Sequence, residues 1–166
     1  MTLARLDRSG SQPQLVFTRI LPHAPEKVWN ALTEPDRLEA WFPDRIEGTI
    51  EPHGKLRFFA DEHDFSFDGE VLEFEPLRLL EIRWGTDILR FELRPTGDGT
   101  TLVITDTFDE LGKAARDGAG WHECVDFLVI DLAGGIPEFA PGQRWGAVHE
   151  QYVRTFGPDA STIGPP

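Results

Sequence analysis

Regular alternation of apolar and polar residues through the middle of the chain is the feature that most constrains its fold. Seven segments are strand-like, and the last six follow one another closely: 14–21, 45–51, 55–60, 65–72, 79–84, 89–94 and 101–108. Because successive side chains of a strand point to opposite faces, this alternation predicts a sheet with one buried face and one solvent-exposed face. The connections are short, and 97–99 has the composition of a hairpin turn. An antiparallel meander is therefore expected.

Helical periodicity flanks the alternating region on both sides. After the first strand, Pro25 suits the first turn of one short helix and Pro35 that of a second. A long helix is expected over 118–135, where five residues form one apolar stripe: Trp121, Cys124, Val125, Leu128 and Leu132. The sequence thus predicts an α+β fold in which a curved antiparallel sheet wraps around a long C-terminal helix.

Composition suggests where the folded domain begins and ends. Residues 1–12 are expected to form a loose arm, 13–136 the domain, and 137–166 an extension with a short helix. That last helix carries three aromatic residues, namely Trp145, Tyr152 and Phe156. If all three were exposed they would form an apolar surface patch that favours association, so the helix is expected to dock on the body or on the second subunit of a homodimer.

Charge and composition exclude several classes of function. Asp and Glu number 29 against 16 Lys and Arg, which gives a formal net charge of −13. This excess repels nucleic-acid phosphates and anionic membrane surfaces, so neither nucleic-acid binding nor membrane insertion is expected. The sequence shows no signal peptide and no apolar run near the roughly 20 residues that span a bilayer, so a cytoplasmic protein is expected. The single cysteine, Cys124, excludes an intrachain disulfide.

Four segments between residue 14 and about residue 135 carry a family resemblance: "APEKVWNALTEPDRLEAWF", "GEVLEFEPLRLLEIRW", "GTTLVITDTFD" and "GWHECVDFL". They resemble the START-like superfamily, also called SRPBCC, and within it the Aha-type proteins, which are similar to the C-terminal domain of the activator of the heat-shock protein 90 ATPase. The resemblance implies a helix-grip fold with a cavity for a hydrophobic or amphipathic small molecule. It does not imply co-chaperone activity, because the eukaryotic activator has a separate N-terminal chaperone-binding domain and a shared fold is weak evidence for a shared function.

Asp106 is the polar residue of greatest interest in the expected sheet. Alternation puts it on the same face as Leu102, Ile104 and Phe108, so its carboxyl group is expected in the cavity wall. A buried carboxylate must find a partner or take up a proton, which would make Asp106 a polar anchor or a general base. The alternative is a bulge or strand end that turns it to solvent. Many Aha-type proteins carry His at this position, so no role of that His transfers to this chain.

The motifs predict no metal or cofactor site. His63 lies in the acidic turn Asp61–Asp64, but adjacent residues on one turn rarely converge on one ion. Cys124 is expected to be buried and inert, because a catalytic thiol needs an adjacent base and an electropositive setting. No Gly-x-Ser-x-Gly elbow or phosphate loop is present, and Asp106 is the sole weak candidate for a catalytic residue. His122 and Glu123 are expected to point outward from the long helix.

Aromatic residues on the inner face predict a ligand site between the sheet and the long helix. The expected lining consists of Phe58, Phe67, Trp84, Phe91, Asp106, Trp121 and Cys124, with Trp41 and Phe42 near the mouth. The first hypothesis is a protein that binds a hydrophobic small molecule, such as a lipid, in a stress response. The second is a cyclase, dehydratase or hydrolase that acts on a polyketide-like or aromatic compound through Asp106. The third is an interaction module for a chaperone.

Overall fold

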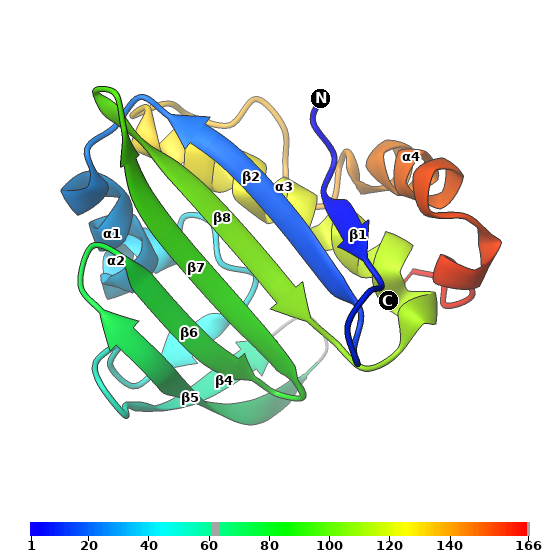
Figure 1. Cartoon of the computed structure of the whole chain (residues 1–166), viewed down its shortest axis with the longest axis horizontal. Helices are drawn as coiled ribbons and strands as arrows, with labels where there is room; N and C mark the ends of the chain where they lie inside the picture. Colours follow the sequence, from blue (N-terminus) through cyan, green and yellow to red (C-terminus); the bar gives the residue numbers. More distant parts are fainter. Residues whose placement is uncertain (61–63, 166) are drawn as a thin grey trace.

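A single antiparallel sheet forms the framework of the computed structural model, which describes residues 1–60 and 64–165 (Figure 1). The described strands are β1 (Arg5–Asp7), β2 (Gln14–Leu21), β3 (Arg45–Glu47), β4 (Lys55–Ala60), β5 (Phe65–Glu75), β6 (Leu79–Trp84), β7 (Asp87–Thr96) and β8 (Gly99–Thr107). Their order in the sheet is β1-β2-β8-β7-β6-β5-β4-β3, and each neighbouring pair is antiparallel. The predicted meander is confirmed for β3 to β8, with β2 closing against β8.

The helices lie close to their predicted positions, although the long helix begins four residues before the predicted range 118–135 and ends three residues before the end of that range. Two short helices, α1 (Pro25–Thr33) and α2 (Pro35–Leu38), follow β2, and each begins at its proline. The long helix α3 (Ala114–Leu132) lies across the concave face of the sheet, and α4 (Trp145–Phe156) lies beside one end of it (Figure 1). A short 3₁₀ helix precedes α3 (Leu111–Lys113), and another follows α4 (Pro158–Ala160). The α+β helix-grip prediction is confirmed.

The core lies between the sheet and α3. The apolar residues at the inward positions of these strands and helices are buried, among them Trp29, Leu32, Leu80, Ile82, Phe91, Leu93, Leu102, Ile104, Val125 and Leu128. Asp106 shares the buried face of β8 with Leu102, Ile104 and Phe108, as the alternation predicted. The strand therefore does not turn Asp106 to solvent.

The N-terminal segment and β3 differ from the expected elements. Arg5–Asp7 forms β1 on the edge of the sheet instead of a loose arm, because it completes the hydrogen bonds of β2. β3 ends at Glu47 and not at the expected residue 51, because the next residue, Gly48, has a φ of +106°. A side chain would not fit at Gly48, since its Cβ would lie 2.3 Å from the carbonyl oxygen of Lys55. The expected acidic turn with His63 falls mainly on residues 61–63, which are outside the described residues. The domain boundary at residue 136 stays a prediction.

The side of α3 that was expected to face solvent is covered. His122 and Glu123 are buried, because α4, the segment before it and the N-terminus pack over them. The Tyr152 hydroxyl accepts a hydrogen bond from the Ala4 amide at 2.9 Å and lies 2.8 Å from His122 Nδ1. Glu123 accepts a hydrogen bond from the Gly142 amide at 2.7 Å. The last helix thus docks on the body, one of the two places expected for it, but the sequence did not indicate that it would cover His122 and Glu123.

None of the described helices has the length and apolar character that crossing a bilayer requires.

Candidate functional site

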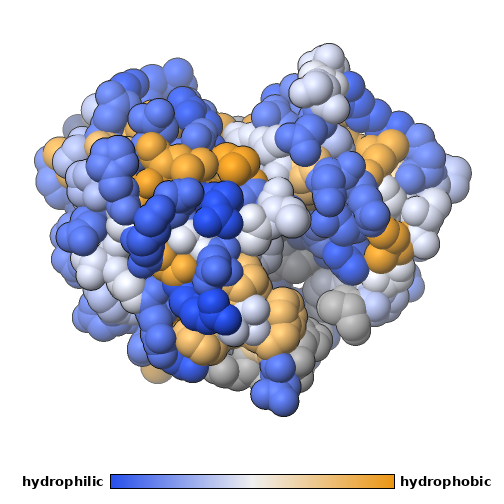
Figure 2. Space-filling model, turned by 90° about the horizontal axis from the view of Figure 1, so that it is seen from below, coloured by the Kyte–Doolittle hydropathy of each residue, from blue (hydrophilic) through white to orange (hydrophobic). Residues whose placement is uncertain are grey.

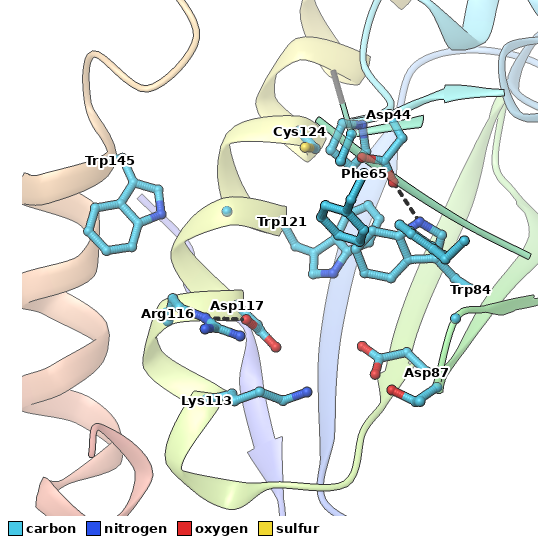
Figure 3. A pocket seen from close by; sticks show the side chains of 16 residues that line it. Asp44, Phe65, Trp84, Asp87, Lys113, Arg116, Asp117, Trp121, Cys124 and Trp145 are labelled. Atoms are coloured by element: carbon cyan, nitrogen blue, oxygen red, sulfur yellow. Dashed lines mark hydrogen bonds and ion pairs between the residues drawn. The ribbon is translucent and has the colours of Figure 1, made fainter. Parts of the chain in front are cut away.

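A cavity of about 570 Å³ opens between α3, the β4–β7 side of the sheet and the first residue of α4. The surface is hollowed between the main body and a smaller lobe that contains the C-terminal segment (Figure 2). The described residues that line the cavity are Pro43, Asp44, Ala60, Phe65, Phe67, Trp84, Gly85, Thr86, Asp87, Lys113, Arg116, Asp117, Gly120, Trp121, Cys124 and Trp145. Its two halves differ in chemistry, one aromatic and one charged (Figure 3).

Aromatic rings make up the first half. Trp84 and Trp121 meet edge to face with centroids 5.1 Å apart, and Phe67 meets Trp84 at 5.6 Å. The indole N–H of Trp84 donates to an Asp44 carboxylate oxygen at 2.8 Å, which fixes the orientation of the ring. Trp145 approaches from α4 on the opposite side (Figure 3). Edge-to-face rings with a fixed tilt give a preformed surface for an apolar or aromatic group.

Carboxyl and basic groups make up the second half. Asp87 is the first residue of β7, and the pairing of Trp84 with Asp87 leaves a two-residue turn at Gly85 and Thr86. Gly85 has a φ of +61°, which a primed hairpin turn requires and which glycine adopts without strain. This turn places Asp87 directly opposite Asp117 of α3 (Figure 3).

Two basic side chains accompany Asp117 on the helix side. Arg116 Nε lies 2.9 Å from an Asp117 oxygen, and Lys113 Nζ lies 3.0 Å from Asp109. Burial alone would lower the pKa of Lys113, but Asp109, Asp87 and Asp117 together raise it. Lys113 therefore stays charged at neutral pH.

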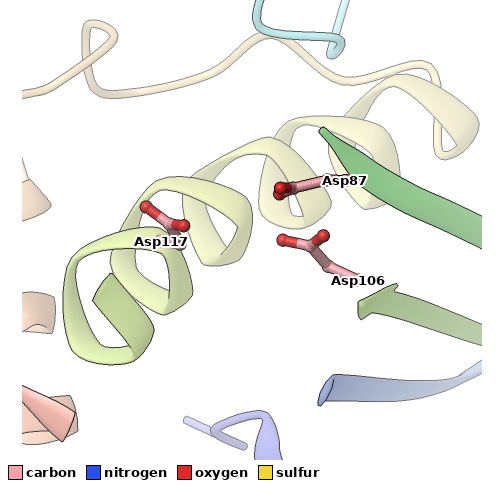
Figure 4. A group of neighbouring side chains, drawn as sticks. All are labelled: Asp87, Asp106 and Asp117. Atoms are coloured by element: carbon pink, nitrogen blue, oxygen red, sulfur yellow. The ribbon is translucent and has the colours of Figure 1, made fainter. Parts of the chain in front are cut away.

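Asp106 lies immediately behind this charged half. Its side chain is almost fully buried, at 1% exposure, and neither carboxylate oxygen has a hydrogen-bond donor among the described residues. Asp87, Asp106 and Asp117 converge, and one oxygen from each lies within 4.8 Å of the other two (Figure 4). Two facing carboxyl groups can hydrogen-bond to each other only if one of them carries a proton.

All three carboxyl groups are biased toward the protonated form. Burial, followed by the charge of Asp87, raises the pKa of Asp106 well above its usual value. Burial also raises the pKa of Asp87, and it raises the pKa of Asp117 despite the opposing effect of Arg116. Loss of solvent thus raises the pKa of both members of the Asp87–Asp106 pair, whereas their mutual contact raises the pKa of Asp106 and lowers that of Asp87, as expected if Asp106 keeps the shared proton.

The predicted site residues fall into two groups. Phe67, Trp84, Trp121 and Cys124 line the cavity. Four aromatic residues of the predicted set lie buried in the core instead: Trp41, Phe42, Phe58 and Phe91.

Trp41 and Phe42 were expected near the mouth of the pocket, and the structure corrects this placement. The Trp41 indole N–H donates to the Ala31 carbonyl at 2.8 Å, which ties it to α1. Phe42 packs against Phe58, Trp84 and Trp121, so it supports the aromatic half from behind. Asp106 is likewise one layer deeper than expected, since Asp87 lies between it and the cavity.

Sequence reasoning missed Asp87 and Asp117, although a signal for each exists. The turn between β7 and β8 sets a register in which Leu89 pairs with Asp106. Asp87 lies two residues before Leu89 in β7, so its side chain is on the same face of the sheet. Asp117 precedes Trp121 and Cys124 by one and two helical turns, so it shares their side of α3. No local pattern marks Trp145, because its position depends on how α4 docks.

Cys124 lines the cavity as a neutral thiol. Burial raises its pKa, and the carboxylates of Glu123 and Asp44 add to the effect. A thiol with a raised pKa is a poor nucleophile, in agreement with the expected inert role.

Similar folds occur among solved structures. A conserved Enterococcus faecalis protein of unknown function matches with a TM-score of 0.76 and 20% identity, over 97% of this chain and 92% of that one. CalU16 from Micromonospora echinospora matches with a TM-score of 0.72 and 20% identity, over 92% and 91%. DynU16, a putative protein in the dynemicin biosynthetic locus, matches with a TM-score of 0.65 and 26% identity, over 77% and 50%. No match is found among curated proteins.

A family model extends the likeness from fold to sequence. The model described as activator of Hsp90 ATPase homolog 1-like protein matches residues 22–132, about two thirds of the chain. This range runs from the end of β2 to the end of α3 and includes the Asp87, Asp106 and Asp117 positions. The chain therefore belongs to the family of activator of Hsp90 ATPase homolog 1-like proteins.

Proposed function

We propose that this protein binds an amphipathic small molecule in the cavity between α3 and the sheet. The observation that carries the proposal is a preformed hollow of about 570 Å³ with aromatic walls at one end and carboxyl groups at the other. Ligand pockets commonly measure about 300–1,000 Å³ and combine apolar walls with a few polar groups that orient the ligand. The ligand class that fits has an apolar or aromatic body and one polar end.

The two halves of the cavity suggest how such a ligand would lie. Its body would contact Trp84, Trp121 and Phe67, where burial of apolar area is favourable. Its polar end would lie toward Asp87 and Asp117. Lipid-like ligands, a role in stress, a homodimer and a cytoplasmic location stay predictions. The chaperone hypothesis gains no support from the cavity, since a docking module does not need one.

A second candidate function is acid–base catalysis on an aromatic or polyketide-like substrate. The observation in its favour is the Asp87–Asp106 pair, in which burial raises both pKa values and the charge of Asp87 raises that of Asp106 further. Such a pair can hold one proton near neutral pH and pass it to a bound substrate. DynU16 is described as a putative protein of a biosynthetic locus, which is compatible with this alternative. A reaction product formed by the wild type and not by Asp87→Asn would favour it.

Blocking the cavity gives a direct test of binding. Gly120 lines the hollow, and a Cβ there would meet nothing within 4 Å, so a side chain at this position starts in open space beside the void. Gly120→Leu should fold at least as stably as the wild type, because Gly in a helix costs about 1 kcal/mol. We expect it to weaken ligand binding at least about tenfold by occupying the aromatic half.

The measurement is a tryptophan-fluorescence titration with a panel of sterols, fatty acids, flavonoids and polyketides. Gly146→Leu is the matched control, since Gly146 is a helical glycine of α4 with open space around it and does not line the cavity. A panel in which nothing binds the wild type, or in which Gly120→Leu binds as well as Gly146→Leu, would overturn the proposal.

A further inference from the structure

We propose that Asp87, Asp106 and Asp117 bind a divalent cation of about the size of Ca²⁺. The three carboxyl groups come from β7, β8 and α3 and point toward one another at the charged end of the cavity (Figure 4). Oxygen ligands of this kind suit hard cations. The inference goes beyond the proposed function, because an ion at this position needs no organic ligand.

The spacing of the oxygens allows a cation of this size. One oxygen of each carboxyl group lies within 4.8 Å of the other two. Three oxygens with this spacing surround a point that is about 2.8 Å or less from each, close to the bond length of about 2.3–2.6 Å that Ca²⁺ prefers. Mg²⁺ needs bonds of about 2.0–2.1 Å and a near-ideal octahedron, whereas the shell of Ca²⁺ is flexible. A calcium-sized ion can therefore contact all three groups with little movement of the side chains.

Asp106 provides an independent observation that points to a ligand. It is 1% exposed, and both of its oxygens lack a hydrogen-bond donor among the described residues. Buried polar groups almost always have a partner, and a buried carboxylate without one is among the costliest arrangements in a protein. The side chain is aimed at Asp87 and Asp117, which places its unmet demand inside the cluster (Figure 4).

The nearby basic residues meet that demand only in part, through the charge of Lys113. Lys113 pairs with Asp109 and Arg116 pairs with Asp117, while no basic side chain in the described part of the chain forms an ion pair with Asp87 or Asp106. When ionised, the cluster would hold an excess of negative charge in a poorly solvated place, and for this reason its carboxyl groups are biased toward protonation. A divalent cation would neutralise that excess and would also remove the repulsion between the facing carboxylates.

The ion would remain reachable from the cavity. Asp87 and Asp117 line the hollow, whereas Asp106 closes the inner side. Three carboxyl groups supply only part of the six to eight oxygens that Ca²⁺ takes, so water or an oxygen of a bound ligand would complete the shell. The proposed ligand site and ion site would then adjoin.

The test uses the full chain, stripped with EDTA, and the metals alone. Calorimetric titration with CaCl₂ should show saturable binding, and Ca²⁺ should raise the melting temperature. Tb³⁺ should give luminescence on tryptophan excitation, because Trp84 and Trp121 line the same cavity, and Ca²⁺ should displace it. Asp106→Asn and Asp87→Asn should each weaken binding at least about tenfold, since even indirect partners of metal ligands cost that much.

Asp98→Asn is the control for general attraction of cations to an acidic protein, because Asp98 is exposed in the β7–β8 turn and outside the cluster. It should bind both ions as the wild type does. Circular dichroism should show the wild-type fold for all three variants. Absence of saturable Ca²⁺ binding, or equal binding by wild type and Asp106→Asn, would overturn the assignment.

Gly120→Leu separates this inference from the proposed ligand function. The substitution adds a side chain to the cavity wall and changes none of the three carboxyl groups. Ca²⁺ binding by Gly120→Leu with loss of organic-ligand binding supports both proposals. Organic-ligand binding without any Ca²⁺ binding overturns the ion site alone.

Discussion

His122 shows how one residue gains a role that its local sequence does not indicate. Its Nδ1 lies 2.8 Å from the Tyr152 hydroxyl, which already accepts a hydrogen bond from the Ala4 amide. The Tyr152 hydroxyl can therefore donate its own proton to His122 Nδ1, provided that Nδ1 is unprotonated. Burial lowers the pKa of His122, while the nearby Asp126 opposes the effect and Arg19 and Arg144 add to it.

This shift predicts a loss of stability in mild acid. Because the folded pKa lies below the unfolded value of about 6.5, the unfolded chain binds more protons in that range, so stability falls as the pH drops below about 6.5. His122→Gln removes the titrating group, and its unfolding free energy should depend less on pH between 7.5 and 5.5. Urea unfolding at both pH values checks this. An identical pH dependence in variant and wild type would contradict it.

Docking of α4 on α3 depends on a small contact region. Gly118 leaves room for the Tyr152 ring, since a Cβ at that position would lie 3.1 Å from the ring. Tyr152 itself is fully buried, and burial raises its pKa to about 12. The contact joins α3, α4 and the N-terminal segment through one hydroxyl group.

Tyr152→Phe should destabilise the protein without changing its shape. The ring still fits beside Gly118, but the Ala4 amide and His122 Nδ1 lose their partner, which costs about 1–3 kcal/mol. Chemical denaturation measures the loss. Thr155→Val is a control on the same helix, because the Thr155 hydroxyl bonds only to the exposed Gln151 carbonyl. Equal stability of the two variants would mean that the buried hydroxyl does not hold α4 in place.

The molecule as a whole is organised around the core between sheet and helices. Trp29 of α1 is buried, and its ring meets that of Phe74 edge to face with the centroids 5.3 Å apart. Trp29→Ala should lower the free energy of unfolding by about 3–5 kcal/mol, because it leaves a large void. Ile20→Ala, at a position that is 76% exposed, should change it by no more than about 0.5 kcal/mol. Denaturant unfolding compares the two, and a loss below about 1 kcal/mol for Trp29→Ala would place this ring outside the core.

Local periodicity was sufficient to predict the sheet, the helices and the inward face of β8, because side-chain direction repeats every two residues in a strand and every 3.6 in a helix. Asp106 was found in this way, as were Trp84 and Trp121 on the cavity side. Turn composition also marked the β7–β8 hairpin, whose register would have added Asp87.

The tertiary structure alone decided which inward residues line a void and which fill the core. Phe58 and Phe91 have the same pattern as Phe67, yet only Phe67 reaches the cavity, because Phe42 packs on Phe58 and Trp41 packs on Phe91. The convergence of Asp87, Asp106 and Asp117 likewise needs β7, β8 and α3 together. Contacts between elements distant in the chain depend on packing over the whole core, and no local pattern in the sequence encodes them.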